Sequence, residues 1–220
     1  MTLLEQELKD LRQELLNMFL AVNNQLLKSE KALLEFDKDL AAEITKAEKR
    51  INSLELKIDR DCENILALYS PVAVDLRFVL SVYKINHELE RIADIADGIA
   101  NYVNNVKAPF PKKAIINIKI EEMFSQCQAM MDNVIDSFEK EDTKIARRVF
   151  KQDELLNTIN SNCSSAIIEN YDEKNAEALF YLLSCIRKLE RAGDLIKNIS
   201  EELIFSIESK VIKHRKKTIN

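Results

Sequence analysis

The apolar residues of this chain recur every three or four positions through almost its whole length. Between residues 37 and 69 the spacing is regular, and the apolar stripe consists of Leu40, Ile44, Ala47, Ile51, Leu54, Ile58, Cys62 and Ile65. This spacing places the apolar side chains on one face of an α-helix. Similar patterns predict helices at about residues 3–27, 37–69, 72–106, 113–139, 142–170 and 176–213. The pattern therefore predicts long amphipathic helices and no strands.

Proline residues mark the boundaries between the predicted helices. Pro71 ends the second helix and is tolerated in the first turn of the third. Two further prolines in the segment 107–112 make this segment the clearest boundary in the chain. Long helices joined by short turns form antiparallel bundles. We therefore expect an all-α fold with two tandem antiparallel three-helix bundles, at residues 1–107 and 112–220.

Composition narrows the possible functions. The 220 residues include only two glycines and three prolines, which excludes Gly-rich phosphate-binding loops. The net charge of −5 argues against a broad nucleic-acid-binding face. No apolar stretch reaches the ~18 residues of a membrane span, and the four cysteines lack metal-binding spacing, so we expect a cytoplasmic protein with free thiols. The basic run at residues 210–217 is expected to complement the dipole of the last helix.

One short motif occurs twice, one hundred residues apart. Residues 89–94 and 189–194 both read L-E-R-x-x-D, and each copy lies within a predicted helix. The two carboxylates of each copy, Glu90 with Asp94 and Glu190 with Asp194, are four residues apart and share one helix face. Because like charges at this spacing repel, a bound cation would offset the repulsion in both copies.

Further oxygen ligands continue these acidic stripes. The first half contributes Glu48, Asn52, Glu55 and Asp59 on the second helix, and Glu90, Asp94, Asp97 and Asn101 on the third. The second half contributes Asp153, Asn157 and Asn160 on the fifth helix, and Glu190, Asp194, Asn198 and Glu201 on the sixth. Facing stripes of this kind suit Mg²⁺, Mn²⁺, Ca²⁺ or iron. The alternative is an ordinary solvated face with surface ion pairs, and spacing alone leaves both interpretations open.

The sequence offers little catalytic machinery. A di-iron oxidase in a helical bundle needs Glu-x-x-His on two helices, and neither His87 nor His214 follows an acid by three residues. We interpret His87 as a surface or interhelical histidine. Because no Ser/His/Asp or Cys/His arrangement is recognisable either, we expect a protein that is not an enzyme.

Two segments resemble the signatures of the PhoU family. Residues 71–77, PVAVDLR, followed by ELERIAD at 88–94, are similar to the first-repeat signature P-x-A-x-D-L-R…E-L-E-R-I-G-D. Residues 190–194, ERAGD, with NISE at 198–201, are similar to the second-repeat signature E-R-I-G-D…N-I-x-E. The chain departs from the family pattern at Ala93, Ala192, Asn157, Ile159 and Ser161. The last three stand where acids are common, which weakens the second metal site more than the first.

The resemblance implies a function and a set of partners. PhoU proteins are cytoplasmic regulators that connect the ATPase subunit of a phosphate ABC transporter to a phosphate-sensing histidine kinase. Many form homodimers, and the membrane is reached only through the partners. The alternatives are an accessory subunit of a secondary phosphate transporter and a metal-buffering helical bundle.

The resemblance also implies metal bound through E-x-x-x-D motifs, with iron, manganese, magnesium and zinc as candidates. It implies that Glu90 and Asp94 hold the first metal, with Glu48, Glu55 and Asp59 as partners and Asp97 nearby. It implies a second site at Glu190 and Asp194, supported by Asp153, Asn198 and Glu201.

Overall fold

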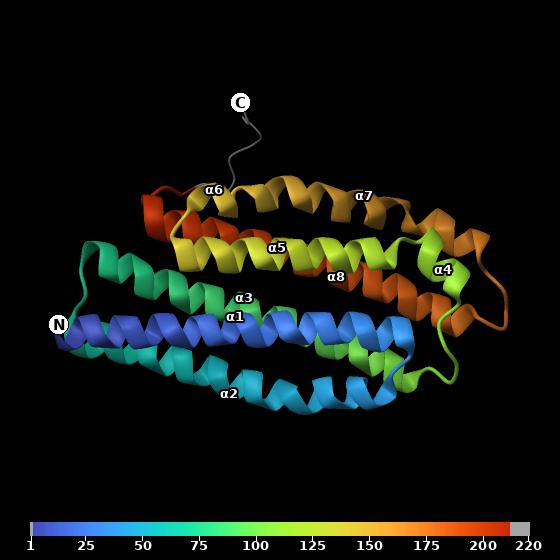
Figure 1. The fold of residues 1–220 in the computed structure, drawn as a ribbon, viewed down its shortest axis with the longest axis horizontal. Helices are drawn as coiled ribbons and strands as arrows, with labels where there is room; N and C mark the ends of the chain where they lie inside the picture. Colours follow the sequence, from blue (N-terminus) through green and yellow to red (C-terminus); the bar gives the residue numbers. More distant parts are fainter. Residues whose placement is uncertain (1, 212–220) are drawn as a thin grey trace.

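The computed structural model describes residues 2–211, and within them every regular element is an α-helix (Figure 1). The elements are α1 (Leu3–Glu35), α2 (Lys38–Tyr69), α3 (Ala73–Asn105), α4 (Lys112–Asn117), α5 (Ile120–Lys140), α6 (Thr143–Ala146), α7 (Arg148–Glu169) and α8 (Ala176–Glu208). The predicted all-α architecture of two tandem three-helix bundles is confirmed. No helix within residues 2–211 is both long and apolar enough to cross a membrane.

The first bundle consists of α1, α2 and α3, packed around a continuous aliphatic core. Thr2 and Glu5 form a reciprocal capping box at the start of α1, and the Asp37 carboxylate caps α2 by accepting from the Leu40 N–H at 2.9 Å. The helix α1 continues to Glu35, beyond the predicted end at residue 27, because Ala32 and Leu33 extend its buried stripe. Local capping and one long apolar stripe therefore define each helix of this bundle.

The second bundle consists of α5, α7 and α8, with the short helices α4 and α6 at its ends. The prediction of a single helix over 113–139 is wrong, because Lys119 adopts the left-handed conformation (φ 58°) between α4 and α5. This break allows both Ile118 and Ile120 to be buried, whereas a continuous helix would turn them to different sides. The predicted helix 142–170 is also divided, by a tight turn at Arg147 that keeps right-handed helical angles.

The last helix ends earlier than the sequence pattern indicated. Helix α8 stops at Glu208, where Ser209 is left-handed with φ 58°. Lys210 is exposed and pairs with Glu208 at 3.3 Å. Most of the basic run and the predicted helix end at Lys213 lie outside the described residues. The four cysteines are free and buried, as expected.

The two bundles pack side by side, and α3 and α8 run antiparallel along their interface (Figure 1). Helix α1 also contacts α5. Lys84 pairs with the buried Glu202 at 3.3 Å, while Tyr102 stacks on Tyr181 with ring centroids 4.9 Å apart. Because Lys84 and Tyr102 lie towards opposite ends of α3, these contacts show that α3 and α8 are paired over most of their length.

Candidate metal centre

The acidic stripes of the first bundle face each other between α2 and α3. Glu48 of α2 and Glu90 and Asp94 of α3 offer oxygen atoms that all lie within 4.8 Å of one another. A second group with the same closeness consists of Glu55, His87 and Glu90. Glu90 belongs to both groups, so the two form one continuous cluster of possible ligands. The structure therefore brings Glu48, Glu55, Glu90 and Asp94 together.

Burial and mutual repulsion disfavour ionisation of the carboxyl groups in this cluster. Burial raises the pKa of Glu90, and the nearby carboxylates of Asp94 and Glu55 raise it further. Burial also raises the pKa of Glu48, partly opposed by a hydrogen bond to Asn52. The Glu48 Oε2 atom is buried and has no hydrogen-bond partner among the described residues. An orphaned buried oxygen amid surplus negative charge fits a hard divalent cation.

Two predicted ligands of the first site lie beside the cluster rather than within it. Asp59 accepts a hydrogen bond from the Asn86 Nδ2 at 2.9 Å, and this bond links α2 to α3. Asp97 accepts from the Asn101 Nδ2 at 2.8 Å, while its Oδ1 is buried and has no hydrogen-bond partner within residues 2–211. Asp97 is close enough to raise the pKa of Glu48, after the larger effects of burial and Asp94. Asp97 thus adds negative charge beside the cluster, whereas Asp59 links α2 to α3 through Asn86.

His87 is a possible ligand that the sequence analysis missed. Its side chain is exposed, as expected of a surface histidine, but its Nδ1 atom lies 3.7 Å from the Glu55 Oε1. The available signal was its position three residues before Glu90, which places both on one helix face. His87 and Glu90 form the reverse order, His-x-x-Glu, of the Glu-x-x-His motif.

In the second bundle, a lysine side chain reduces the repulsion between the clustered carboxylates. The Lys197 Nζ lies 2.9 Å from the Asp153 Oδ2 and also contacts Asp194. Burial by itself lowers the pKa of Lys197, but the hydrogen bonds to both aspartates outweigh this effect and raise it. Burial raises the pKa of Glu190, as do Asp194 and Asp153, whereas Lys197 opposes the shift. The Lys197 ammonium group thus offsets part of the negative charge of Asp153 and Asp194.

Lys197 was overlooked because the sequence analysis counted only oxygen ligands. It occupies the position equivalent to Asp97, one hundred residues earlier, so the first repeat reads E-x-x-x-D-x-x-D and the second E-x-x-x-D-x-x-K. Within residues 2–211, both groups of three close ligand residues lie in the first bundle.

The remaining predicted ligands of the second site are outside these groups. The Asn198 Nδ2 donates to the Glu88 Oε1 at 3.2 Å, so Asn198 contributes to the interface between the bundles. Glu201 is half-buried on α8. The structure therefore brings Asp153, Glu190 and Asp194 together around Lys197, but does not add Asn198 or Glu201 to a ligand group.

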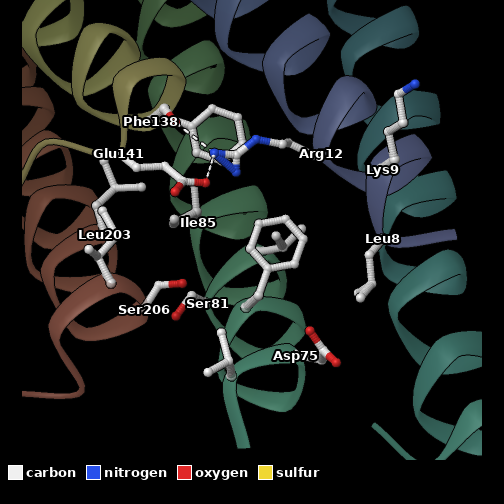
Figure 2. Close-up of a pocket in the computed structure, with 14 residues that line it drawn as sticks. Leu8, Lys9, Arg12, Asp75, Ser81, Ile85, Phe138, Glu141, Leu203 and Ser206 are labelled. Atoms are coloured by element: carbon white, nitrogen blue, oxygen red, sulfur yellow. Dashed lines mark hydrogen bonds and ion pairs between the residues drawn. The ribbon is translucent and has the colours of Figure 1, made fainter. Parts of the chain in front are cut away.

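A separate cavity of about 400 Å³ opens where α1, α3, α5 and α8 meet (Figure 2). Its walls are largely apolar, with Leu8, Ile85 and Leu203 among the lining residues. Figure 2 shows Arg12 at one edge, where its guanidinium donates to the Phe138 carbonyl at 3.1 Å and pairs with Glu141. Arg12 therefore acts as a bridge between the bundles.

The comparisons with known proteins agree with this architecture. The chain matches the PhoU domain over residues 15–103 and 120–203. A phosphate-specific transport system accessory protein PhoU homolog of Aquifex aeolicus is 30% identical over 95% of this chain and 95% of its own length. The corresponding PhoU of Escherichia coli is 28% identical over 94% of this chain and 86% of its own length.

Solved structures show the same fold. The crystal structure of PhoU from Pseudomonas aeruginosa superposes with a TM-score of 0.88 at 28% identity, covering 94% of this chain and 99% of that one. The phosphate transport system regulatory protein PhoU from Streptococcus pneumoniae gives a TM-score of 0.85 at 27% identity, over 96% of this chain and 99% of that one. With both repeats matched and relatives similar over most of their length, this chain belongs to the PhoU family.

Proposed function

We propose that this protein is a non-enzymatic regulator of phosphate transport that acts in the cytoplasm. In this role it connects the ATPase subunit of a phosphate ABC transporter to a phosphate-sensing histidine kinase. The observation that carries the proposal is similarity over nearly the whole chain to proteins named phosphate-specific transport system accessory proteins. Both bundles are included in the match, so the similarity is not confined to one shared module.

The metal centre is the second part of the proposal. Glu48, Glu90 and Asp94 would hold a divalent cation between α2 and α3, with Glu55 and His87 beside it. Oxygen-rich ligands favour magnesium, manganese or iron, and zinc would draw on His87. The bound cation would stabilise the first bundle by linking two of its helices. Lys197 makes a matching metal in the second bundle unnecessary, so we expect one centre per chain.

The adaptor role is tested in cells of the source organism. A clean deletion should change phosphate uptake and the expression of phosphate-starvation genes, and the tagged protein should co-purify with a phosphate-transporter ATPase or a sensor kinase. An unchanged phosphate response in the deletion strain would contradict the proposal. Recovery of a secondary phosphate transporter would instead support the accessory-subunit alternative.

A metal-buffering function is the second candidate, because the first bundle concentrates carboxylates around Glu90. It predicts several equivalents of metal on the purified protein and a growth defect that follows metal rather than phosphate. The adaptor proposal predicts about one equivalent and a phosphate-dependent defect.

The metal centre itself is tested with metal-free protein. Adding Mn²⁺ or Mg²⁺ should raise the melting temperature of the parent protein, and Asp94→Asn should reduce this rise because it removes one ligand charge. Glu139→Gln, an exposed carboxylate on α5, is the control. Equal metal-induced shifts in all three proteins would show that the carboxylates are not ligands.

A further inference from the structure

A second pocket lies on the interface between α3 and α8, and its lining is strongly cationic. It has a volume of about 470 Å³ and is lined by Arg91, Asp94 and Ile95 of α3 and by Arg187, Lys188 and Arg191 of α8. Four cationic side chains thus share its wall with a single carboxylate. This is unexpected in a chain whose net charge is −5. A concentration of positive charge of this kind attracts anions.

These charges are largely uncompensated by the protein. Arg91 pairs with Glu88 at 3.0 Å. The guanidinium groups of Arg187 and Arg191 form no ion pair or hydrogen bond with any residue between 2 and 211. Both are exposed, so their donors remain available to a ligand. Because like charges gathered in one pocket repel, an anion bound among them would stabilise the arrangement.

Lys188 is positioned by packing rather than by an acid. Its Nζ atom lies 5.7 Å from the ring centroid of Tyr102, which itself stacks on Tyr181. The lysine also lies against Gly98, where an added Cβ would be 2.5 Å from the Nζ and 2.9 Å from the Cε. The ammonium group is therefore held beside the pocket by an aromatic face and by the absence of a side chain at position 98.

The two repeats differ at this place. Arg187 and Lys188 occupy the positions that His87 and Glu88 hold in the first repeat, whereas Arg91 and Arg191 are equivalent and shared. Two of the four cationic side chains, Arg91 and Arg191, therefore belong to the duplicated motif. The other two, Arg187 and Lys188, distinguish the second repeat from the first.

We propose that this pocket binds a multiply charged phosphoanion, either inorganic phosphate or the phosphate groups of a larger metabolite. Guanidinium groups match the geometry of phosphate oxygens and can bind them in pairs, while the lysine adds a compact point charge. The volume is within the usual range of small-molecule pockets. The inference goes beyond the proposed role in phosphate transport and does not depend on it, since it follows from the charge and shape of the pocket.

The proposal is tested by calorimetric titration of the full chain, free of metal and at constant ionic strength. Inorganic phosphate, pyrophosphate and ATP are the three probes. Binding of inorganic phosphate alone identifies free phosphate as the source of the anion. Binding of pyrophosphate or ATP without inorganic phosphate identifies a larger metabolite.

Four variants locate the binding. Arg187→Gln and Arg191→Gln should each weaken it by about tenfold, because each removes a charge-assisted hydrogen bond. Asp94→Asn should strengthen it, since it removes the one negative charge from the wall. Arg60→Gln, an exposed arginine on α2, is the control and should bind as the parent does.

The variant Gly98→Ala distinguishes an effect on anion binding in the pocket from an effect on the stability of the whole protein. The new Cβ displaces the end of Lys188 and should weaken binding, while alanine in a helix interior should leave the melting temperature equal or higher. Absence of binding by the parent protein for all three probes would overturn the proposal. So would arginine variants that bind as tightly as Arg60→Gln.

Discussion

Single residues decide how each bundle compensates its buried acids. Asp97 and Lys197 occupy equivalent positions, yet Asp97 places a further carboxylate beside the acidic cluster of the first bundle, whereas Lys197 places an ammonium group between Asp153 and Asp194. Asp153, the partner of Lys197, is only 5% exposed. A buried charge of this kind is costly when its partner is removed.

Removing the Lys197 ammonium should therefore destabilise the protein. We expect Lys197→Met to lower the free energy of unfolding by about 1–3 kcal/mol, because Asp153 loses its partner while the partly exposed site retains some solvent screening. Denaturant unfolding measures the change, with the exposed Lys151→Met as control. Lys197→Asp, which restores the acidic pattern of the first repeat, should instead make the second bundle responsive to added Mn²⁺. A Lys197→Met variant as stable as the control would show that the ion pair contributes little.

Asp61 of α2 lies beside Glu14 of α1 and introduces a pH dependence of stability. Burial and the adjacent Glu14 raise the pKa of Asp61 from its usual 3.8 to about 6. The folded state therefore binds this proton more tightly than the unfolded state, so stability decreases as the pH rises from about 4 through 6.

Asp61→Asn should remove the loss of stability that accompanies ionisation of Asp61. The variant should melt at a higher temperature than the parent at pH 7.5, and the difference should become small near pH 4. Thermal unfolding at several pH values tests this, and the exposed Glu63→Gln on the same helix is the control. A constant difference across the pH range would contradict the assignment to Asp61.

At the scale of helices, the sequence pattern predicted the position of most helices. It did not predict where a helix is interrupted. The regular stripes and the prolines predicted α2 and α3 almost to the residue. The break at Lys119 was not predicted because no glycine or proline marks it, and its cause is the burial of isoleucines on both sides. The first acidic cluster was predictable because its residues follow helical spacing, whereas the pairing of Lys197 required knowledge of which helix faces α8.

Gly193 lies where α7 and α8 approach each other closely, and its lack of a side chain permits this packing. An added Cβ would lie 2.3 Å from the Leu156 Cδ1 and 3.4 Å from the Asp153 Oδ1, so the buried Leu156 side chain would have to shift or the two helices to move apart. We expect Gly193→Ala to lower the free energy of unfolding by about 1–2 kcal/mol, the cost of overpacking less the gain in helix propensity. Gly98→Ala is the matched control, because the contact there is the flexible end of a lysine. Equal stability of the two variants would contradict the close approach.

At the scale of the whole molecule, the interface between the bundles could not be predicted from periodicity. Periodicity shows that a helix has an apolar face, but not which other helix covers it. The structure shows that α3 contacts the two other helices of its own bundle and also α8. Arg12 adds a second connection, since its guanidinium lies 4.9 Å from the Phe138 ring centroid and donates to the Phe138 carbonyl.

The two bundles should consequently unfold together. We expect a single calorimetric transition for the parent protein, and Arg12→Ala should shift that transition to lower temperature, with a loss of about 1–3 kcal/mol, without splitting it. Arg60→Ala is the exposed control. Two separate transitions in the parent protein would show that the bundles are independent.

The antiparallel pairing of α3 with α8 has a consequence for the origin of the chain. Two copies of one half-length polypeptide, each with three helices, would pair their third helices in this way around a two-fold axis. Every residue at such an interface would occur twice, so any substitution would have to be tolerated at both positions. Fusion of the copies into one gene removes that constraint. The two halves differ in this way at His87-Glu88 against Arg187-Lys188, and at Asp97 against Lys197, and a single gene permits such differences. One half retained the carboxylate cluster, and the other contributed most of the positive charge at the shared surface.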